Sequence, residues 1–252
     1  EHHFLDDGYL PNFVPVAGAA ASVTKRLRIS TDIALLPFAH PLRLAEDLAV
    51  LDQLSNGRME LGAGLGYAPH EFRAFGIPRS HRVSRTEECL DILRLAWQGE
   101  RFSYAGKRYR FDDVLVTPQP VQAGGPPLWL ATTSAASVDR AIRYGTHVLP
   151  QGPRPVVLDA WRDGLRAAGG NPDTTRVGII RSVLVTDDPE RDWPPVREAE
   201  RYRMRVYSRF SEEAGRGGKA IAFGRFEQLD EEGIIRSGTF DLIGPAVDPP
   251  DP

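Results

Sequence analysis

The chain has 252 residues, of which 41% are hydrophobic and 26% charged, as is usual for globular proteins. Its formal net charge of −3 gives no basic field for nucleic acid, and no apolar run approaches the roughly 18 residues of a membrane span. The single cysteine, Cys89, excludes an internal disulfide framework and fits a reducing, cytoplasmic compartment. Cys89 falls within an expected helix, where an inert thiol is the usual state.

The chain begins Glu1-His2-His3-Phe4. Neighbouring side chains of an extended segment point to opposite sides, so this histidine pair cannot easily share one metal ion, and we predict no metal site. A surface histidine pair is the simplest interpretation of these residues alone. A short helix is expected over residues 17–25.

The residues from Ile29 to Leu36 form an apolar, partly β-branched run that Pro37 ends, which predicts a buried strand. Asp32 stands out in it, because a charged side chain in such a strand is costly unless it is paired or faces a wet cavity. A buried Asp that caps a neighbouring loop would also explain this residue.

A helix is predicted from Pro41, with an apolar stripe that includes Leu44, Leu48 and Leu51, and Asn56-Gly57 ends it. A second strand starts at Met59 and runs into three spaced glycines, Gly62, Gly64 and Gly66. Strand, helix and strand with short connections indicate a parallel α/β unit, whose functional residues collect at the carboxyl ends of the strands.

The glycine run is not a dinucleotide-binding motif. The third glycine of G-x-G-x-x-G would fall at Tyr67 or Pro69, and neither allows the close helix packing that this motif needs. A tight turn after the strand and a backbone surface for a flat ligand are both consistent with the pattern.

The second half of the chain alternates further expected helices and strands. Thr133, Ser134 and Ser137 lie between an expected strand and an expected helix that Ser134 would cap. Free backbone N–H groups and hydroxyls at such a helix start can bind phosphate, although plain capping explains the same residues. The other expected elements are a helix over 80–97, an aromatic hairpin over 102–111, strands over 128–131, 147–149 and 177–185, and helices over 157–168 and from Pro194 to Gly215.

One long stretch, ALLPFAHPLRLAEDLAVLDQLSNGRMELGAGLGYAPHEFRAFG (residues 34–76), resembles the core of the bacterial luciferase-like flavin monooxygenases. The resemblance rests on the spaced features LP..HP, AED…LD..S.GR and G.G….EF.AFG. It implies an α/β fold of the TIM (β/α)8 type, with one barrel domain over residues 1–252, the hairpin of 102–111 outside it and a mobile region near 215–240. Against that pattern the first and last strands of the barrel lie outside the chain, so we expect an incomplete barrel, from a fragment or a truncated gene.

The resemblance also implies roles for individual residues. His2 would act in the chemistry at the flavin, and a non-proline cis peptide between Asp32 and Ile33 would lie beneath the flavin ring. The loop residues Gly64, Leu65 and Tyr67 would lie under the cofactor. The flavin phosphate would be held by Thr133, Ser134 and Ser137. Luciferase has an Arg where Leu65 stands and a Glu where Thr133 stands.

The implied activity is that of a monooxygenase that uses reduced FMN and molecular oxygen to oxidise a small organic substrate. A flavin reductase would supply the reduced flavin, and a homodimer is expected, with the helix of residues 41–54 near its interface. Two alternatives remain open. One is an oxidoreductase that transfers hydride with a deazaflavin, coenzyme F-420, and the other is a non-catalytic luciferase-like subunit or truncated remnant.

Overall fold

The computed structural model describes residues 1–150, 154–179, 182–215 and 240–243 of the chain. The chain divides into two compact units, one of residues 1–66 and 70–178 and the other of residues 67–69 and 179–252. We expect a mobile region near residues 215–240. Except for residues 215 and 240, this region lies outside the described residues. A single barrel domain over residues 1–252 stays a prediction.

The first unit is built on a parallel sheet. Its strands are β1 (Ile29–Ser30), β2 (Ala34–Leu35), β3 (Met59–Gly64), β6 (Leu128–Ala131) and β7 (His147–Leu149). The order is β1-β3-β6-β7, and β2 also pairs with β3, so β1 and β2 share one neighbour. A parallel bridge from Val148 to Val177 continues the sheet beyond β7. This is the expected α/β class, and within the described residues the sheet does not close into a barrel.

Helices cover this sheet in the order that the sequence predicts. The helix α2 (Pro41–Ser55) begins at the predicted proline and ends at Asn56 and Gly57, which have φ angles of 54° and 75°. The helix α1 (Phe13–Val23) begins four residues before the predicted start, because the Asn12 side chain accepts a hydrogen bond from the backbone N–H of Val14. The remaining helices of this unit are α3 (Pro69–Ala74), α4 (Arg82–Ala96), α5 (Ala135–Arg143), α6 (Pro155–Ala167) and the short 3-10 turns Leu36–Phe38, Arg79–His81 and Pro172–Thr174.

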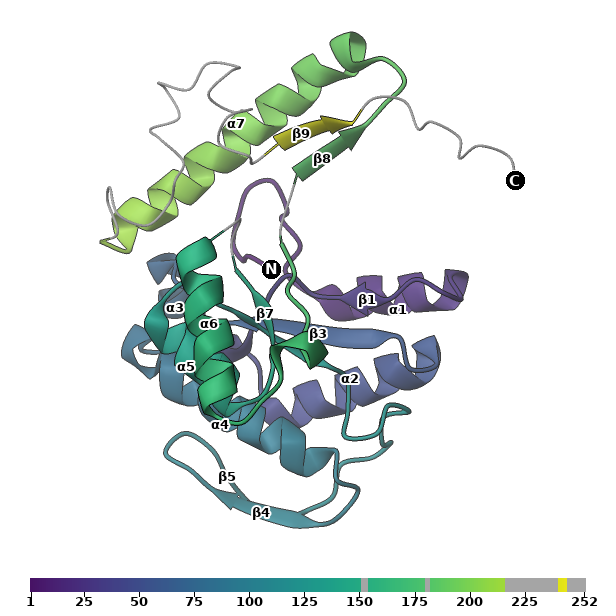
Figure 1. Cartoon of the computed structure of the whole chain (residues 1–252), viewed down its shortest axis with the longest axis vertical. Helices are drawn as coiled ribbons and strands as arrows, with labels where there is room; N and C mark the ends of the chain where they lie inside the picture. Colours follow the sequence, from purple (N-terminus) through teal and green to yellow (C-terminus); the bar gives the residue numbers. More distant parts are fainter. Residues whose placement is uncertain (151–153, 180–181, 216–239, 244–252) are drawn as a thin grey trace. The chain divides into compact units, whose positions relative to one another are not determined.

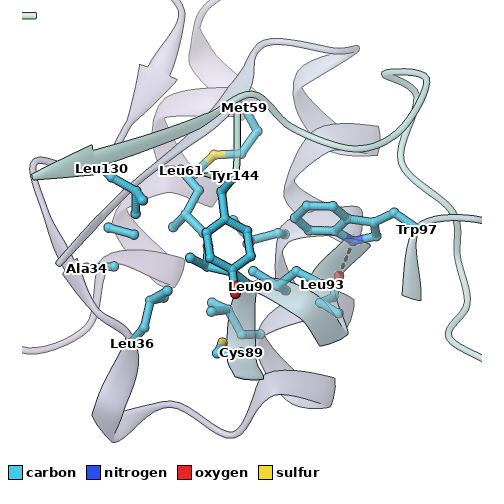
Figure 2. Packing of buried hydrophobic residues seen from close by; sticks show 14 of the residues in the cluster. Ala34, Leu36, Met59, Leu61, Cys89, Leu90, Leu93, Trp97, Leu130 and Tyr144 are labelled. Atoms are coloured by element: carbon cyan, nitrogen blue, oxygen red, sulfur yellow. Dashed lines mark hydrogen bonds between the residues drawn. The ribbon is translucent and has the colours of Figure 1, made fainter. Parts of the chain in front are cut away.

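The hydrophobic core of the first unit lies between the sheet and its helices. Figure 2 shows Leu61 and Leu130 of the sheet near Leu90 and Leu93 of α4, and all four are buried. The indole N–H of Trp97 donates to the carbonyl oxygen of Ala45 at 3.2 Å, which fixes α4 to α2.

Cys89 is also fully buried in this core, with an exposed fraction of 0%. Burial raises the pKa of its thiol to about 12, although the nearby Arg85 guanidinium lowers it slightly. A thiol that is neutral at physiological pH is a poor nucleophile, so the expected inert cysteine is confirmed.

The predicted aromatic hairpin forms from β4 (Phe102–Ala105) and β5 (Arg110–Val114), which pair antiparallel. Figure 1 shows it extending away from the sheet, past α4. The carboxylate of Glu88 in α4 accepts backbone N–H groups from the hairpin turn, at Lys107, Arg108 and Tyr109. This buried carboxylate therefore holds the turn of the hairpin against the helix.

The second unit contains α7 (Pro189–Glu213) and a parallel pair of strands, β8 (Ser182–Val185) and β9 (Phe240–Ile243). The predicted start of α7 at Pro194 is wrong, because the Asp188 side chain accepts the N–H of Arg191 and caps a helix that begins five residues earlier, at Pro189. Among the described residues, no helix is both long enough and apolar enough to cross a membrane.

Candidate active site

The carboxyl ends of the parallel strands in the first unit meet at one edge of the sheet. Ala34 lies opposite Ala63, Ala63 lies opposite Leu130, and Leu130 lies opposite Val148. The residues that follow these strands therefore converge on the same edge. They include Leu65 after β3 and the turn of residues 132–134 after β6.

The strand predicted over residues 29–36 is interrupted at this edge. The peptide bond between Asp32 and Ile33 is cis, as the resemblance implied. The Thr31 hydroxyl takes the place of backbone pairing here, because it donates to the carbonyl oxygen of Gly62 at 2.6 Å and accepts the N–H of Gly62 at 3.0 Å. Sequence reasoning did not find this role for Thr31, since it depends on a partner 31 residues away.

The glycines of β3 leave bare backbone beside this interruption. A Cβ atom on Gly64 would lie 2.0 Å from Cδ1 of Ile33 and 3.8 Å from Cβ of Ala131. A Cβ atom on Gly62 would lie 2.0 Å from the carbonyl oxygen of Thr31. Glycine is therefore required for close packing, and the Ile33 side chain lies over Gly64. Leu65, which follows, is half-buried.

The Asp32 side chain lies on a cavity of about 410 Å³. The cavity wall is mostly apolar and is formed by α1, by the segment of residues 29–33 and by Glu1, Tyr9, Leu10 and Met59. Loss of water beside this wall raises the pKa of the Asp32 carboxyl. Asp32 is itself exposed and lies between β1 and β2, so the expected charge inside a buried strand is not found.

His2 is buried, with an exposed fraction of 7%, so it is not a surface histidine. Its Nδ1 atom lies 3.0 Å from Oε1 of Glu71, and its ring packs edge-on against the ring of Tyr9 at a centroid distance of 5.3 Å. The neighbouring ring of His3 contacts Glu1 instead, with 2.7 Å between Nε2 and Oε1. The two rings therefore have different carboxylate partners.

The segment that carries His2 is attached next to the cis bond. The Glu1 carboxylate accepts the N–H of Leu35 at 2.7 Å. Ile33 in turn covers Gly64, and Gly64 adjoins Ala131 at the end of β6. Glu71 and Tyr9 are the residues of this edge that sequence reasoning missed. Glu71 belongs to the quoted EF.AFG feature, but no local pattern indicates its partner.

The turn after β6 is organised by Ser137. Its hydroxyl oxygen accepts the N–H groups of Thr133 and Ser134, both at 2.9 Å, and donates to the carbonyl oxygen of Ser134 at 2.7 Å. Ser134 caps α5, as predicted. The Thr133 and Ser134 side chains are exposed, whereas Ser137 is buried. The hydroxyl of Ser137 is thus engaged within the turn, and that of Ser134 lies 3.3 Å from it, whereas Thr133 is exposed.

Tyr67 is the predicted site residue that the structure does not group with this edge. It belongs to the second unit, where its ring packs against that of Phe210 in α7 at a centroid distance of 6.4 Å. In the part of the chain that the structure describes, no cluster of three or more His, Cys, Asp or Glu side chains could hold a metal ion.

The model of the luciferase-like monooxygenase family matches residues 1–246 of the chain. The chain belongs to the luciferase-like monooxygenase family. The match extends the resemblance seen at residues 34–76 over nearly the whole sequence and confirms the predicted family.

Named relatives of this luciferase-like chain include the FMNH2-dependent dimethylsulfone monooxygenase of Pseudomonas putida, 30% identical over 181 residues, which are 70% of this chain and 50% of that protein. The chain spans about half the length of the curated relatives it matches. Among solved structures, monooxygenase RslO1 of Streptomyces bottropensis matches with a TM-score of 0.70 and 27% identity, over 100% of this chain and 81% of that one. A coenzyme F-420-dependent secondary alcohol dehydrogenase shares the fold, with a TM-score of 0.68 and 22% identity, over 91% of this chain and 77% of that one.

Proposed function

We propose that this luciferase-like chain binds reduced FMN at the carboxyl edge of its sheet and uses molecular oxygen to oxidise a small organic substrate. The observation that carries the proposal is that Ile33, Gly64 and the turn after β6 lie at one edge of the sheet, with the segment that carries His2 attached at Leu35. The family match and the FMNH2-dependent relative support the choice of cofactor.

The residues at this edge fit a flat ring with a phosphate tail. The Ile33 side chain, packed closely over Gly64, offers an apolar surface, which suits an isoalloxazine ring. Asp32 and Leu65 would lie at the border of the ring, and Tyr67 stays a predicted cofactor contact. Leu65 stands where the resemblance places an Arg, so we expect the phosphate to have another partner in this chain.

The turn of residues 133–137 would hold that phosphate. Thr133 and Ser134 are exposed, and the first N–H groups of α5 carry the partial positive charge of the helix start. Ser137 would act indirectly, because its hydroxyl fixes the turn from within.

When bound, reduced FMN supplies the electrons with which oxygen is activated, and the rest of the mechanism falls to the protein. The buried His2 imidazole would hold or move a proton near the reacting atoms. The apolar cavity wall beside Asp32 would keep water from the site and admit the substrate.

Two partners follow from this proposal. A separate flavin reductase would supply the reduced FMN, as the FMNH2 dependence of the dimethylsulfone relative suggests. A homodimer would use α2, which exposes Val50 and Leu54 with fractions of 43% and 59%.

The experiment compares reduced FMN, reduced riboflavin and reduced coenzyme F-420 as ligands of the purified protein under anaerobic conditions, with melting temperature as the readout. We expect FMN to raise the melting temperature more than riboflavin, because only FMN carries the phosphate. A rise with coenzyme F-420 alone would replace the proposal with the deazaflavin alternative. No rise with any of the three would favour a non-catalytic subunit.

The variant Ser134→Asp tests the phosphate-binding turn. Asp caps a helix as well as Ser does, so α5 should stay intact while the new charge repels phosphate. We expect FMN affinity to fall about tenfold or more and riboflavin affinity to stay the same. Asn12→Asp at the start of α1 is the matched control, because it makes the same change of a cap residue elsewhere. Equal losses for FMN and riboflavin would contradict this role of the turn.

A further inference from the structure

Glu71 of α3 is a fully buried carboxylate at the candidate active site, with an exposed fraction of 0%. Its Oε1 atom accepts the backbone N–H of His3 and lies 3.0 Å from Nδ1 of His2. Its Oε2 atom has no hydrogen-bond partner among the residues that the structure describes. Burial of a carboxylate is costly, so the two contacts of Oε1 must compensate for much of that cost.

The chemistry of the contact determines where the His2 proton lies. An ionised carboxylate can only accept hydrogen bonds, so the His2 ring must donate from Nδ1. A neutral ring then carries its lone pair on Nε2, which becomes the atom that can take up a proton. The contact also limits rotation of the ring, because Nδ1 must stay directed at Oε1.

The adjacent His3 shows the opposite arrangement. Its Nε2 atom lies 2.7 Å from the Glu1 carboxylate, so its ring donates from Nε2 rather than from Nδ1. Two neighbouring histidines with similar burial, 7% and 9% exposed, thus contact two different glutamates through different ring nitrogens, which favours opposite tautomers. Because the two rings are similarly buried, a difference between their tautomers reflects the glutamate contact and not burial alone.

We propose that Glu71 is a positioning residue that fixes His2 in the tautomer protonated at Nδ1, so that Nε2 serves as the proton-accepting atom. The tautomer itself follows from the contacts within the first unit. Its consequence for turnover rests on the proposed function, in which His2 acts near the reacting atoms.

A purely structural role for Glu71 would be different. In that case the carboxylate would only attach residues 1–4 to α3 through the N–H of His3. Glu71→Gln keeps an acceptor for that N–H and for His2, whereas Glu71→Met removes both contacts and keeps a side chain of similar length. Comparing the two variants therefore distinguishes attachment of residues 1–4 from positioning of the His2 ring.

The experiment is a ¹⁵N NMR measurement of the histidine rings in flavin-free protein. The chain has six histidines, and His2→Asn identifies the His2 signals by difference. We expect the wild-type His2 ring to be protonated at Nδ1. We expect this preference to persist in part in Glu71→Gln and to be lost in Glu71→Met, while Glu1→Gln, the matched control, changes the His3 signals and leaves those of His2 alone.

Wild-type His2 protonated at Nε2 and not at Nδ1 would overturn the proposal, and this measurement needs no variant to fold. An unchanged His2 signal in folded Glu71→Met would overturn it as well. Turnover is measured separately, and we expect kcat to fall roughly tenfold or more in Glu71→Met, and less in Glu71→Gln, with the KM for substrate unchanged. If the NMR signals are as expected but the wild type shows no turnover, the proposed function is contradicted. The role of Glu71 in setting the His2 tautomer would still hold.

Discussion

At the scale of single residues, Glu60 shows how the sheet tolerates a charge on its face. Its side chain is 2% exposed, and it accepts hydrogen bonds from Arg28, from the indole N–H of Trp129, and from both terminal nitrogens of Arg176 at 3.1 and 3.0 Å. Burial by itself would raise the pKa of this carboxyl. The hydrogen bonds from Trp129, Arg176 and Arg28 outweigh that effect and hold the pKa below its ordinary value of 4.5.

We predict that Glu60→Gln lowers the free energy of unfolding by about 1–3 kcal/mol at pH 7, because the variant loses charged hydrogen bonds. Because the pKa is lower in the folded state, the stabilisation is present above pH 4.5 and is lost as pH falls through the folded pKa. Urea unfolding at pH 7 and at successively lower pH should therefore show the two proteins converging in acid.

The matched control for Glu60 is Asp163→Asn, which removes an exposed carboxylate paired with Arg166 at 3.2 Å. We expect a change below about 0.5 kcal/mol there, as for most surface ion pairs. A difference between wild type and Glu60→Gln that grows as the pH is lowered would contradict the assignment of the pKa shift.

At the scale of elements, the junction between β1 and β2 depends on one hydroxyl. Thr31 is 8% exposed and bridges both backbone groups of Gly62, which the interrupted strand does not pair. The hydroxyl therefore completes the sheet at the point where the candidate active site begins.

We predict that Thr31→Val, which keeps the shape of the side chain, lowers the free energy of unfolding by about 2 kcal/mol or more, because it leaves two buried backbone groups without partners. Thr31→Ser keeps the hydroxyl and should cost about 1 kcal/mol or less. Chemical unfolding of both variants measures the difference. Thr133→Val, at an exposed threonine of the same edge, is the control, and equal stability of the two Thr31 variants would refute the bridging role.

At the scale of the whole molecule, the proposed homodimer depends on α2. Val50 and Leu54 are four residues apart, so they share one face of the helix, and both are exposed. A single exposed apolar side chain is common on a protein surface, but two neighbouring exposed apolar side chains favour an interface with another chain.

We predict a dimer in sedimentation experiments and a shift towards monomer in Leu54→Glu, because a charge cannot be buried cheaply in an apolar interface. Leu27→Glu, at a residue that is 58% exposed outside the helices, should leave the association unchanged. A wild-type monomer, or equal effects of the two variants, would exclude α2 as the interface.

The sequence by itself determined the family, the α/β class and those elements whose signals are local. Pro41 and Asn56-Gly57 bound α2 as predicted, the aromatic hairpin forms, and Ser134 caps α5. The resemblance over residues 34–76 also anticipated the cis bond between Asp32 and Ile33. Proline, the left-handed residues and helix caps act within a few positions, so the chain order alone reveals them.

The tertiary structure alone decided which distant side chains meet. It divided the expected strand of residues 29–36 into β1 and β2, and it joined Thr31 to Gly62 across 31 positions. It brought Glu71 to His2 across 69 positions and directed the Ser137 hydroxyl into its own turn. Partners of buried polar groups are set by the packing of whole elements, because any nearby donor can satisfy an acceptor, and no local pattern records which donor folding will supply.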